Sequence, residues 1–163
     1  MYELYRVTKE TFVEFEKEPS KELIISQDDK LSISTNGLKS YIYWNLITFG
    51  KCRVFSICDK EGKLVHYSYV VEKCWKFPFL QKADFEIGPC ETAFEFRGQG
   101  IYPYVLSCIC KNKLRESNCA YMIVDSNNIS SIRGITKCGF KKIMCLRRDL
   151  IKRYVRTDKM EIL

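Results

Sequence analysis

The sequence predicts an α/β domain in which helices pack on one central sheet, and three observations support this prediction. Residues 83–151 alternate between strand-like and helix-like segments, and residues 51–71 hold two β-rich runs around a polar turn. The 163 residues, 46% of them hydrophobic, suffice for one core of ordinary size. No linker rich in Gly, Pro or Ser and no repeat divides the chain, so we expect residues 1–163 to form one domain.

The N-terminal segment is predicted to begin with a strand. Residues 2–7 alternate as in a half-buried strand. A short helix is expected over residues 9–17, because Thr8 is a good capping residue and Phe12 and Phe15 recur at helical spacing.

The sequence pattern is unclear in residues 19–39 and clear in residues 51–71. The stretch 19–39 is mostly polar and has no clear pattern. The runs CRVFSIC and LVHYSYVV, around the Gly-containing turn at 59–63, predict a hairpin, with two unrelated strands as the alternative.

The second half alternates between the two types of element. The expected order is a strand at 83–92, a helix at 99–117, a buried strand at 121–125, a helix at 129–138 and a strand at 140–151. This order favours helices layered on a sheet.

Charge and hydropathy narrow the class of partner. Lys and Arg number 27 against 20 Asp and Glu, a formal net charge of +7 that suits anionic ligands such as nucleic acid, acidic lipids or phosphorylated cofactors. No apolar run approaches the roughly 20 residues that span a bilayer, and residues 1–10 do not have the pattern of an export signal. We therefore expect a soluble, cytoplasmic protein with no membrane partner.

A basic run near the C-terminus favours nucleic-acid binding only weakly, because a solvated surface explains it as well. The run comprises Lys141, Lys142, Arg147, Arg148, Lys152, Arg153 and Arg156. We predict no nucleic-acid partner.

Nine cysteines in a chain without an export signal indicate a reducing compartment and thiols that serve as small core residues. The closest pair, Cys108 and Cys110, lies two residues apart on a predicted helix, where side chains point away from each other. Since His66 is the single histidine, no metal site is predicted.

The most informative segment joins a predicted strand to a predicted helix through Arg97-Gly98-Gln99-Gly100. Glycines allow the backbone to turn so that several N–H groups point at one place, and the helix start adds a partial positive charge there. The turn therefore fits an anion of pyrophosphate size. An ordinary structural turn is the alternative.

A second segment runs from Asn128 to Phe140. Asn128 is placed to cap a helix whose first turn carries Ser131, and Gly139 ends that helix before Phe140 begins a strand. Each part has a plain structural explanation, but the combination is more specific.

Together the two segments resemble the GNAT superfamily of acyl-CoA-dependent N-acyltransferases. Its signature Q/R-x-x-G-x-G/A is matched at Gly98 and Gly100, whereas Glu95 departs at the first position and Arg97 is the nearby substitute. An Asn-x-x-Ser helix start leading to K-x-G-F is matched by residues 128–140. The resemblance covers residues 83–149 and extends to the hairpin at 51–71.

The resemblance implies a mixed, largely antiparallel sheet flanked by helices, in which two splayed strands form a slot for acyl-CoA. Acetyl-CoA is then the co-substrate, with its pyrophosphate on the glycine turn and its pantetheine beside the preceding strand. The residues expected to bind it are Cys90, Thr92, Arg97, Gly98, Gln99, Gly100, Ile101, Tyr102, Asn128 and Ser131.

The implied reaction is direct attack of a primary amine on the thioester, for which a base must remove a proton. Glu86, on the strand leading to the turn, is the first candidate and Glu91 the second. The position where many relatives carry an acidic tyrosine is Ile135. The replacements are Tyr102, Tyr104, Ser131 or Cys138, or an unassisted thiolate departure.

The acceptor is less defined. The segment from 87 to 103 looks like relatives that acetylate amino sugars, so a small amine, such as an amino sugar or its nucleotide, is the first expectation. A protein amine and a non-catalytic CoA-binding module are the alternatives. His66 either faces the acceptor or belongs to a packed strand face. A homodimer fits the aromatic content of 13%.

Overall fold

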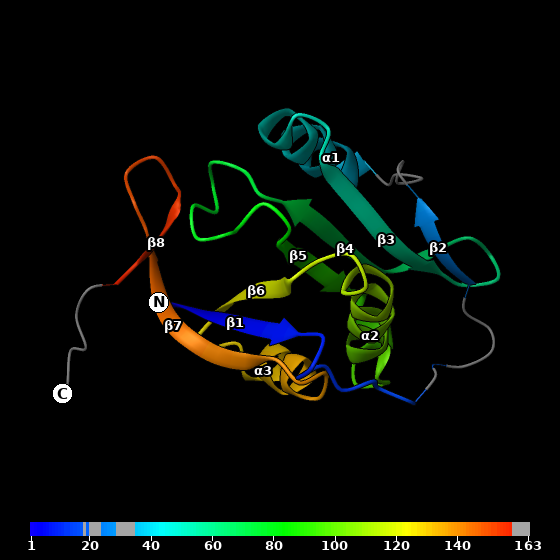
Figure 1. Cartoon of the computed structure of the whole chain (residues 1–163). Helices are drawn as coiled ribbons and strands as arrows, with labels where there is room; N and C mark the ends of the chain where they lie inside the picture. Colours follow the sequence, from blue (N-terminus) through cyan, green and yellow to red (C-terminus); the bar gives the residue numbers. More distant parts are fainter. Residues whose placement is uncertain (18, 20–23, 29–34, 158–163) are drawn as a thin grey trace.

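The structure, a computed structural model, describes residues 1–17, 19, 24–28 and 35–157. These residues form one eight-stranded sheet in the order β2-β3-β4-β5-β6-β1-β7-β8 and three α-helices (Figure 1). The strands are β1 (Tyr2–Thr8), β2 (Ile24–Asp28), β3 (Cys52–Cys58), β4 (Leu64–Glu72), β5 (Phe85–Thr92), β6 (Cys119–Asp125), β7 (Lys141–Arg148) and β8 (Tyr154–Arg156). The helices are α1 (Thr35–Thr48), α2 (Ile101–Lys113) and α3 (Ile129–Thr136), with a 3-10 turn at Phe94–Phe96.

The predicted alternation of the second half is confirmed by β5, α2, β6, α3 and β7, and the predicted hairpin by the antiparallel pairing of β3 with β4. The other neighbouring strands are also antiparallel, except β5 and β6, which are parallel. The sheet is therefore mixed and largely antiparallel, as expected.

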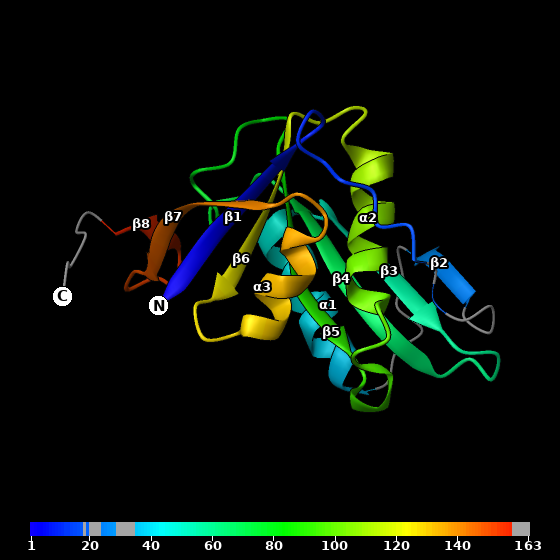
Figure 2. The same cartoon turned by 90° about the horizontal axis from the view of Figure 1, so that it is seen from below.

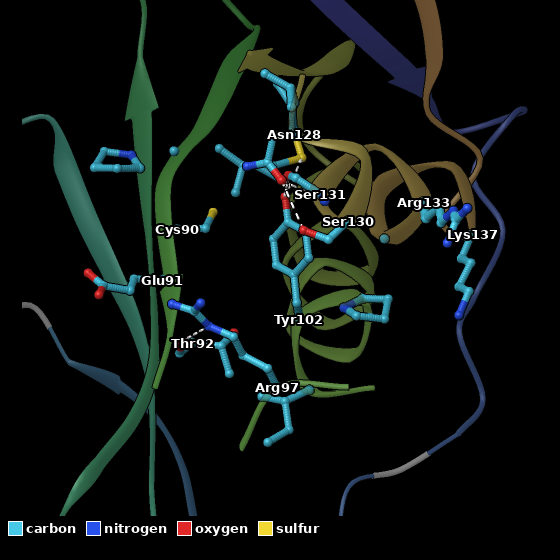
Figure 3. A pocket seen from close by; sticks show the side chains of 18 of the residues that line it. Cys90, Glu91, Thr92, Arg97, Tyr102, Asn128, Ser130, Ser131, Arg133 and Lys137 are labelled. Carbon is cyan, nitrogen blue, oxygen red and sulfur yellow. Dashed lines mark hydrogen bonds between the residues drawn. The ribbon is translucent and has the colours of Figure 1, made fainter. Parts of the chain in front are cut away.

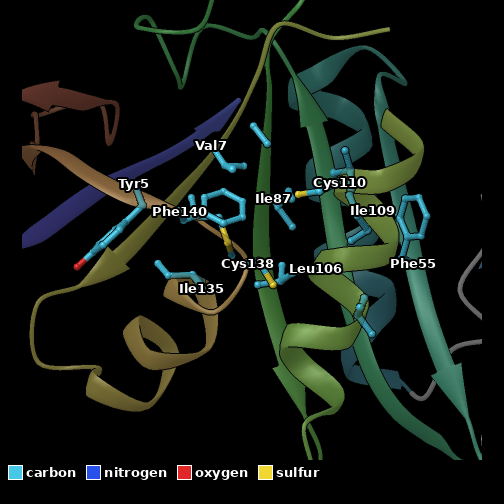
Figure 4. Packing of buried hydrophobic residues seen from close by; sticks show 14 of the residues in the cluster. Tyr5, Val7, Phe55, Ile87, Leu106, Ile109, Cys110, Ile135, Cys138 and Phe140 are labelled. Carbon is cyan, nitrogen blue, oxygen red and sulfur yellow. The ribbon is translucent and has the colours of Figure 1, made fainter. Parts of the chain in front are cut away.

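The helices cover both faces of the sheet, with α2 and α3 on one face and α1 on the other (Figure 2). Two apolar clusters match these layers. The first includes Leu106 and Ile109 of α2 with Ile135 of α3 (Figure 4), and the second includes Trp44 of α1. Burial on both faces removes most of the sheet's apolar surface from water.

The N-terminal strand lies inside the sheet rather than at an edge. β1 pairs with β6 from Tyr2↔Asp125 to Thr8↔Cys119, and with β7 on its other side. The strand is covered on both faces, because Leu4 is buried in the cluster that includes Trp44 and Val7 in the cluster that includes Leu106.

The helix predicted over residues 9–17 is wrong. The chain makes a single turn, in which the Thr8 carbonyl accepts from the Thr11 and Phe12 N–H groups, and then runs extended, with the Val13 N–H donating to the Cys138 carbonyl. Phe12 and Phe15 still pack against the cluster that contains Leu106 of α2. Their apolar spacing therefore reflects a segment that crosses the α2 face of the sheet.

The described parts of the region without a clear pattern, residues 19–39, hold β2 and the start of α1. β2 pairs with β3 from Ile24↔Cys58 to Asp28↔Val54. In α1, the Trp44 ring stacks on Phe77, with 6.0 Å between ring centroids, which ties the helix to the sheet through an aromatic contact.

None of the nine cysteines forms a disulfide, and Cys52, Cys110 and Cys138 are buried in the two clusters. Among the described residues, no three His, Cys, Asp or Glu side chains gather as metal ligands. Within the same residues, no helix is long and apolar enough to cross a bilayer.

Candidate functional site

The site is built where two parallel strands separate. β5 and β6 pair only at Phe85↔Ala120 and Glu86↔Tyr121, and diverge beyond these residues. A cavity of about 610 Å³ opens between them, lined by the last residues of both strands and by the first turns of α2 and α3 (Figure 3). The expected splay of two strands is therefore present.

The start of α2 forms a glycine turn at the mouth of this cavity. Gly98 and Gly100 have φ values of +77° and +84°, which favour glycine. The N–H groups of Ile101 and Tyr102 belong to the first turn of the helix and therefore have no intrahelical acceptor. The capping residue, Gly100, has no side chain that could accept from them. Pro103, with no N–H of its own, fills the third helical position. This turn holds amides and a helix dipole ready for a phosphate group.

Three cationic side chains surround the same cavity, namely Arg97, Arg133 and Lys137. Arg97 is fixed by donation from Nε to the Thr92 carbonyl, 3.0 Å away. The departing residue of the first motif, Glu95, does not line the cavity and instead forms an exposed ion pair with Lys63 at 2.7 Å. The charge beside the turn is therefore mostly positive, as a polyphosphate requires.

Asn128 and Ser131 line the opposite wall. Asn128 Oδ1 accepts from the Ser131 N–H at 3.1 Å and from the Ser130 hydroxyl at 3.0 Å, which confirms Asn128 as the cap of α3. This bond leaves the Ser131 hydroxyl to face the cavity.

Tyr102 reaches across the cavity from α2 to α3. Its hydroxyl lies 3.0 Å from Ser131 Oγ, and a Cβ atom at Gly134 would lie 2.6 Å from its ring. Gly134 therefore provides the space for the ring. Burial is the largest influence on the Tyr102 hydroxyl and raises its pKa well above 10, so the group keeps its proton at neutral pH.

A bulge in β5 sets which side chains face the cavity. Between the pairs Ser68↔Cys90 and Val70↔Ile87, β4 has one residue and β5 has two, Gly88 and Pro89. Because side chains alternate along a strand, the extra residue switches the later side chains of β5 to the opposite face of the sheet. Cys90 and Thr92 consequently line the α2-side cavity, although they are an even number of residues from Glu86.

His66 lies beneath this wall and does not line the cavity. Its Nδ1 is 2.7 Å from Thr92 Oγ1 and its Nε2 is 2.9 Å from Ser68 Oγ. Burial lowers the pKa of His66 to about 3, so the ring is neutral and uses one nitrogen as donor and the other as acceptor. It orients Thr92, and the packed strand face is the better interpretation.

Glu86 lies on the α1 face of the sheet, at the point where the strands separate. The Ile123 N–H donates to its carboxyl, while Glu86 Oε2 is buried and has no partner among the described residues. A Cβ atom at Gly88 would lie 2.7 Å from Oε1, so this glycine makes room for the carboxyl group. Burial raises the pKa of Glu86 well above 4.5, despite the opposing effect of Lys76.

Glu86 lines a second cavity of about 230 Å³, which shares Gly88, Pro89 and Ile123 with the first. The two cavities thus meet at the splay from opposite faces of the sheet. The second cavity is lined by Trp44, Lys76, Phe77, Glu86, Gly88, Pro89, Ile123, Arg148 and Tyr154.

The second base candidate, Glu91, is exposed at the rim of the first cavity. Its Oε2 accepts from the Tyr67 hydroxyl at 2.7 Å, and Figure 3 shows the carboxylate pointing away from Tyr102. Glu91 therefore lies at the edge of the first cavity rather than inside it.

Of the other predicted site residues, some line the first cavity and some do not. Ile101 lines the cavity, but Gln99 does not, because its side chain donates to the Glu95 carbonyl at 3.2 Å. Tyr104 and Cys138 do not line it either, and the Cys138 thiol donates to the Pro103 carbonyl. Ile135 is fully buried in the core. Of the acid candidates, Tyr102 and Ser131 remain at the cavity.

Sequence reasoning missed most of the face of α3 that lines the first cavity. Ser130, Arg133, Gly134 and Lys137 all line the first cavity, and their spacing of three and four residues would have shown one helical face. The second cavity had no such signal, because Trp44, Lys76 and Arg148 come from distant segments.

The sequence matches no protein-family model and no curated protein. Solved structures do match. An acetyltransferase of the GNAT family from Colwellia psychrerythraea is 22% identical with a TM-score of 0.57, covering 86% of this chain and 52% of that one.

A tandem GNAT protein from the clavulanic acid biosynthesis pathway is 12% identical with a TM-score of 0.62, covering 86% and 50%. A GCN5-related glucosamine N-acetyltransferase region of a fungal multi-domain GH3 β-N-acetylglucosaminidase is 14% identical with a TM-score of 0.58, covering 87% and 20%. The chain thus spans about half the length of the first two structures and a fifth of the third. These likenesses show that the chain has the GNAT fold.

Proposed function

We propose that this GNAT-fold chain is an N-acetyltransferase that moves an acetyl group from acetyl-CoA to the primary amine of a small acceptor by direct attack. The observation that carries the proposal is the cavity between β5 and β6, which has an amide turn for phosphate at its mouth and meets, at Gly88, Pro89 and Ile123, a second cavity that holds the buried carboxyl group of Glu86. A binding module without catalysis does not explain Glu86, because a buried carboxyl oxygen without a partner is costly and typical of reactive sites.

The residues present fit acetyl-CoA. The turn at Gly98–Tyr102 suits the pyrophosphate, and Arg97, Arg133 and Lys137 suit its charges. Cys90 and Thr92 stand beside the path to the splay. When bound, acetyl-CoA supplies a thioester whose carbonyl carbon an amine attacks.

Glu86 acts as the base in this proposal. Its raised pKa brings the carboxyl group closer to the range in which it accepts a proton near neutral pH. The ammonium of the acceptor gives a proton to Glu86 Oε2, and the neutral nitrogen forms the new C–N bond while the C–S bond breaks. Of the two protons that the nitrogen loses, one ends on the thiol and one is released to solvent.

Tyr102 acts as the acid in place of the tyrosine missing at Ile135. Its hydroxyl is protonated because burial raises its pKa, and Ser131 holds it from the facing helix. Ser131 positions this hydroxyl and supplies a second hydrogen-bond donor.

The acceptor class stays open between a free small amine, an amino sugar or its nucleotide, and a protein amine. One structural neighbour is described as a glucosamine N-acetyltransferase region, which keeps an amino sugar among the acceptors to be tested.

Two measurements test the function. Acetyl-CoA at about 100 times its Kd should stabilise the protein by about 2.7 kcal/mol and raise its Tm. Thiol release should then depend on an added amine. If neither millimolar acetyl-CoA nor CoA shifts the Tm, both the transferase and the CoA-binding module are refuted.

A further inference from the structure

The second cavity, behind Glu86, has a composition that neither acetyl-CoA nor the catalytic groups explain. Three aromatic side chains, Trp44, Phe77 and Tyr154, form its walls, and two cations, Lys76 and Arg148, line it. Glu86 is its sole carboxylate, and Oε2 of Glu86 has no partner among the described residues. A cavity of this kind presents both a negative and a positive subsite.

Lys76 is held in place by rings rather than by an acidic group. The residue is buried, its Nζ lies 4.5 Å from the Trp44 ring centroid and donates to the Tyr43 hydroxyl at 3.2 Å. No carboxylate of the described residues lies within ion-pair distance of Nζ, Glu86 included. A buried ammonium that no described carboxylate neutralises is suited to bind an anion.

Arg148 adds a second cation on the same cavity. Its Nη2 donates to the Tyr154 hydroxyl at 2.6 Å, and its guanidinium lies 5.0 Å from the ring centroids of Tyr2 and Tyr154. Within the described part of the chain it has no ion pair, because Asp149 pairs with Arg153 instead. The aromatic contacts fix the guanidinium and leave further N–H groups to bind a ligand.

We infer that the acceptor is a small primary amine that carries a carboxylate, with its amine at Glu86 and its carboxylate at Lys76 and Arg148. This inference rests on the proposed function and names the substrate class of that site. Each charge of such a molecule meets an opposite charge in the cavity, and its carbon chain lies against Trp44 and Phe77.

The size of the cavity agrees with this class. Its volume of about 230 Å³ is less than half the 610 Å³ of the first cavity, so it favours a compact acceptor. A nucleotide-linked amino sugar exceeds this space and has no carboxylate at the amine end. A neutral amino sugar leaves Lys76 without an anion.

The test compares amines that differ only in the carboxylate. Glycine, β-alanine and 4-aminobutyrate are each measured against the alkylamine of equal length, with glucosamine as a further acceptor, by thiol release from acetyl-CoA. We expect kcat/KM to be roughly tenfold or more higher for at least one carboxylate-bearing amine than for its alkylamine. Equal values in all three pairs, or glucosamine as the best acceptor, overturn the inference.

Variants locate the effect. Lys76→Gln and Arg148→Gln should each bring the ratio of kcat/KM for the carboxylate-bearing amine to that for its alkylamine closer to one. The Kd for acetyl-CoA should stay unchanged in both variants. Lys76→Arg should keep more of the preference than Lys76→Gln does. Lys73→Gln and Arg147→Gln, exposed cations that line neither cavity, are the matched controls. Arg148 is exposed, so its variant remains informative if Lys76→Gln does not fold. A preference that survives unchanged in Arg148→Gln contradicts the assignment.

Direct binding separates this inference from the proposed function. Calorimetry with the same amines and no acetyl-CoA, on the wild type and on Arg148→Gln, assigns any binding to the second cavity. Binding of carboxylate-bearing amines that Arg148→Gln weakens, without any acetyl transfer, supports the subsite and refutes the transferase. Transfer to alkylamines and carboxylate-bearing amines alike supports the transferase and refutes the subsite.

Discussion

The hydroxyl of Tyr102 lies 3.0 Å from Oγ of Ser131, so a side chain of α2 and one of α3 meet across the cavity between β5 and β6. Burial raises the pKa of this phenol well above 10, so it stays protonated at neutral pH. In the proposed mechanism it takes the role of the tyrosine that is missing at Ile135.

Tyr102→Phe should lower kcat roughly 10²-fold, because it removes a general acid, and leave the Kd for acetyl-CoA within about twofold. The ring that packs at Gly134 is kept, so the fold should survive. Steady-state thiol release and calorimetry provide the two numbers. Tyr5→Phe, which removes a hydroxyl bonded to Glu3 away from the cavity, is the control. A kcat for Tyr102→Phe equal to that of the control would assign the proton to solvent.

Glu86→Gln should lower kcat/KM roughly 10²-fold and change its pH dependence. Because the pKa of Glu86 is raised well above 4.5, wild-type activity should increase as pH rises through that pKa and the carboxyl group becomes a base. The Glu86→Gln variant should lose this increase of activity with pH. Glu72→Gln, an exposed carboxylate at the end of β4, should keep it. A pH profile of Glu86→Gln that superimposes on the wild type would transfer the role to Glu91 or water.

The same carboxyl group predicts the direction in which stability changes with pH. At a pH below 4.5 both folded and unfolded states hold the Glu86 proton, and no difference arises. As pH rises from the unfolded pKa to the raised folded pKa, the unfolded state releases the proton first, so wild-type stability falls. Glu86→Gln stays neutral and should gain stability relative to wild type at neutral pH, but not in acid. Urea unfolding at both pH values measures this, and a constant difference would contradict it.

Gly134→Ala should destabilise the protein, although alanine in a helix interior normally stabilises by about 0.5–1 kcal/mol relative to glycine. The reason is the Tyr102 ring, whose Cδ1 would lie 2.6 Å from the new Cβ. Displacing the ring should also lower kcat. In a Tyr102→Ala background the same change should become neutral or stabilising, and the double-mutant cycle measures the coupling. Additive effects would show that the two residues act independently.

The residues that the sequence placed correctly are those with a local signal. Gly98 and Gly100 mark a turn because few other residues adopt their φ values, and Asn128 caps α3 through a bond to the N–H three residues on. Such features depend on neighbours in the chain. They account for the turn at the mouth of the first cavity and for Asn128 on its far wall.

The parts that it missed depend on distant contacts. Phe12 and Phe15 mimic helical spacing, but their segment is held extended by Cys138 and by the Gly139 turn, where a Cβ would lie 2.1 Å from the Thr11 carbonyl oxygen. Glu86 and Cys90 face opposite sides because of the bulge at Gly88 and Pro89, for which the Gly-Pro pair was the available signal.

Gly98→Ala should raise the Kd for acetyl-CoA severalfold through the backbone of the turn. Gly62, in the β3–β4 turn, is a matched control, since its φ is +81° against +77° and neither position has an atom within 4 Å of an added Cβ. Both substitutions should therefore cost about 1 kcal/mol of stability from the left-handed backbone alone. Only Gly98→Ala changes the N–H groups at the mouth of the cavity. Calorimetry with acetyl-CoA and urea unfolding of both variants separate strain from binding, and equal Kd values for the two variants would refute the phosphate role of the turn.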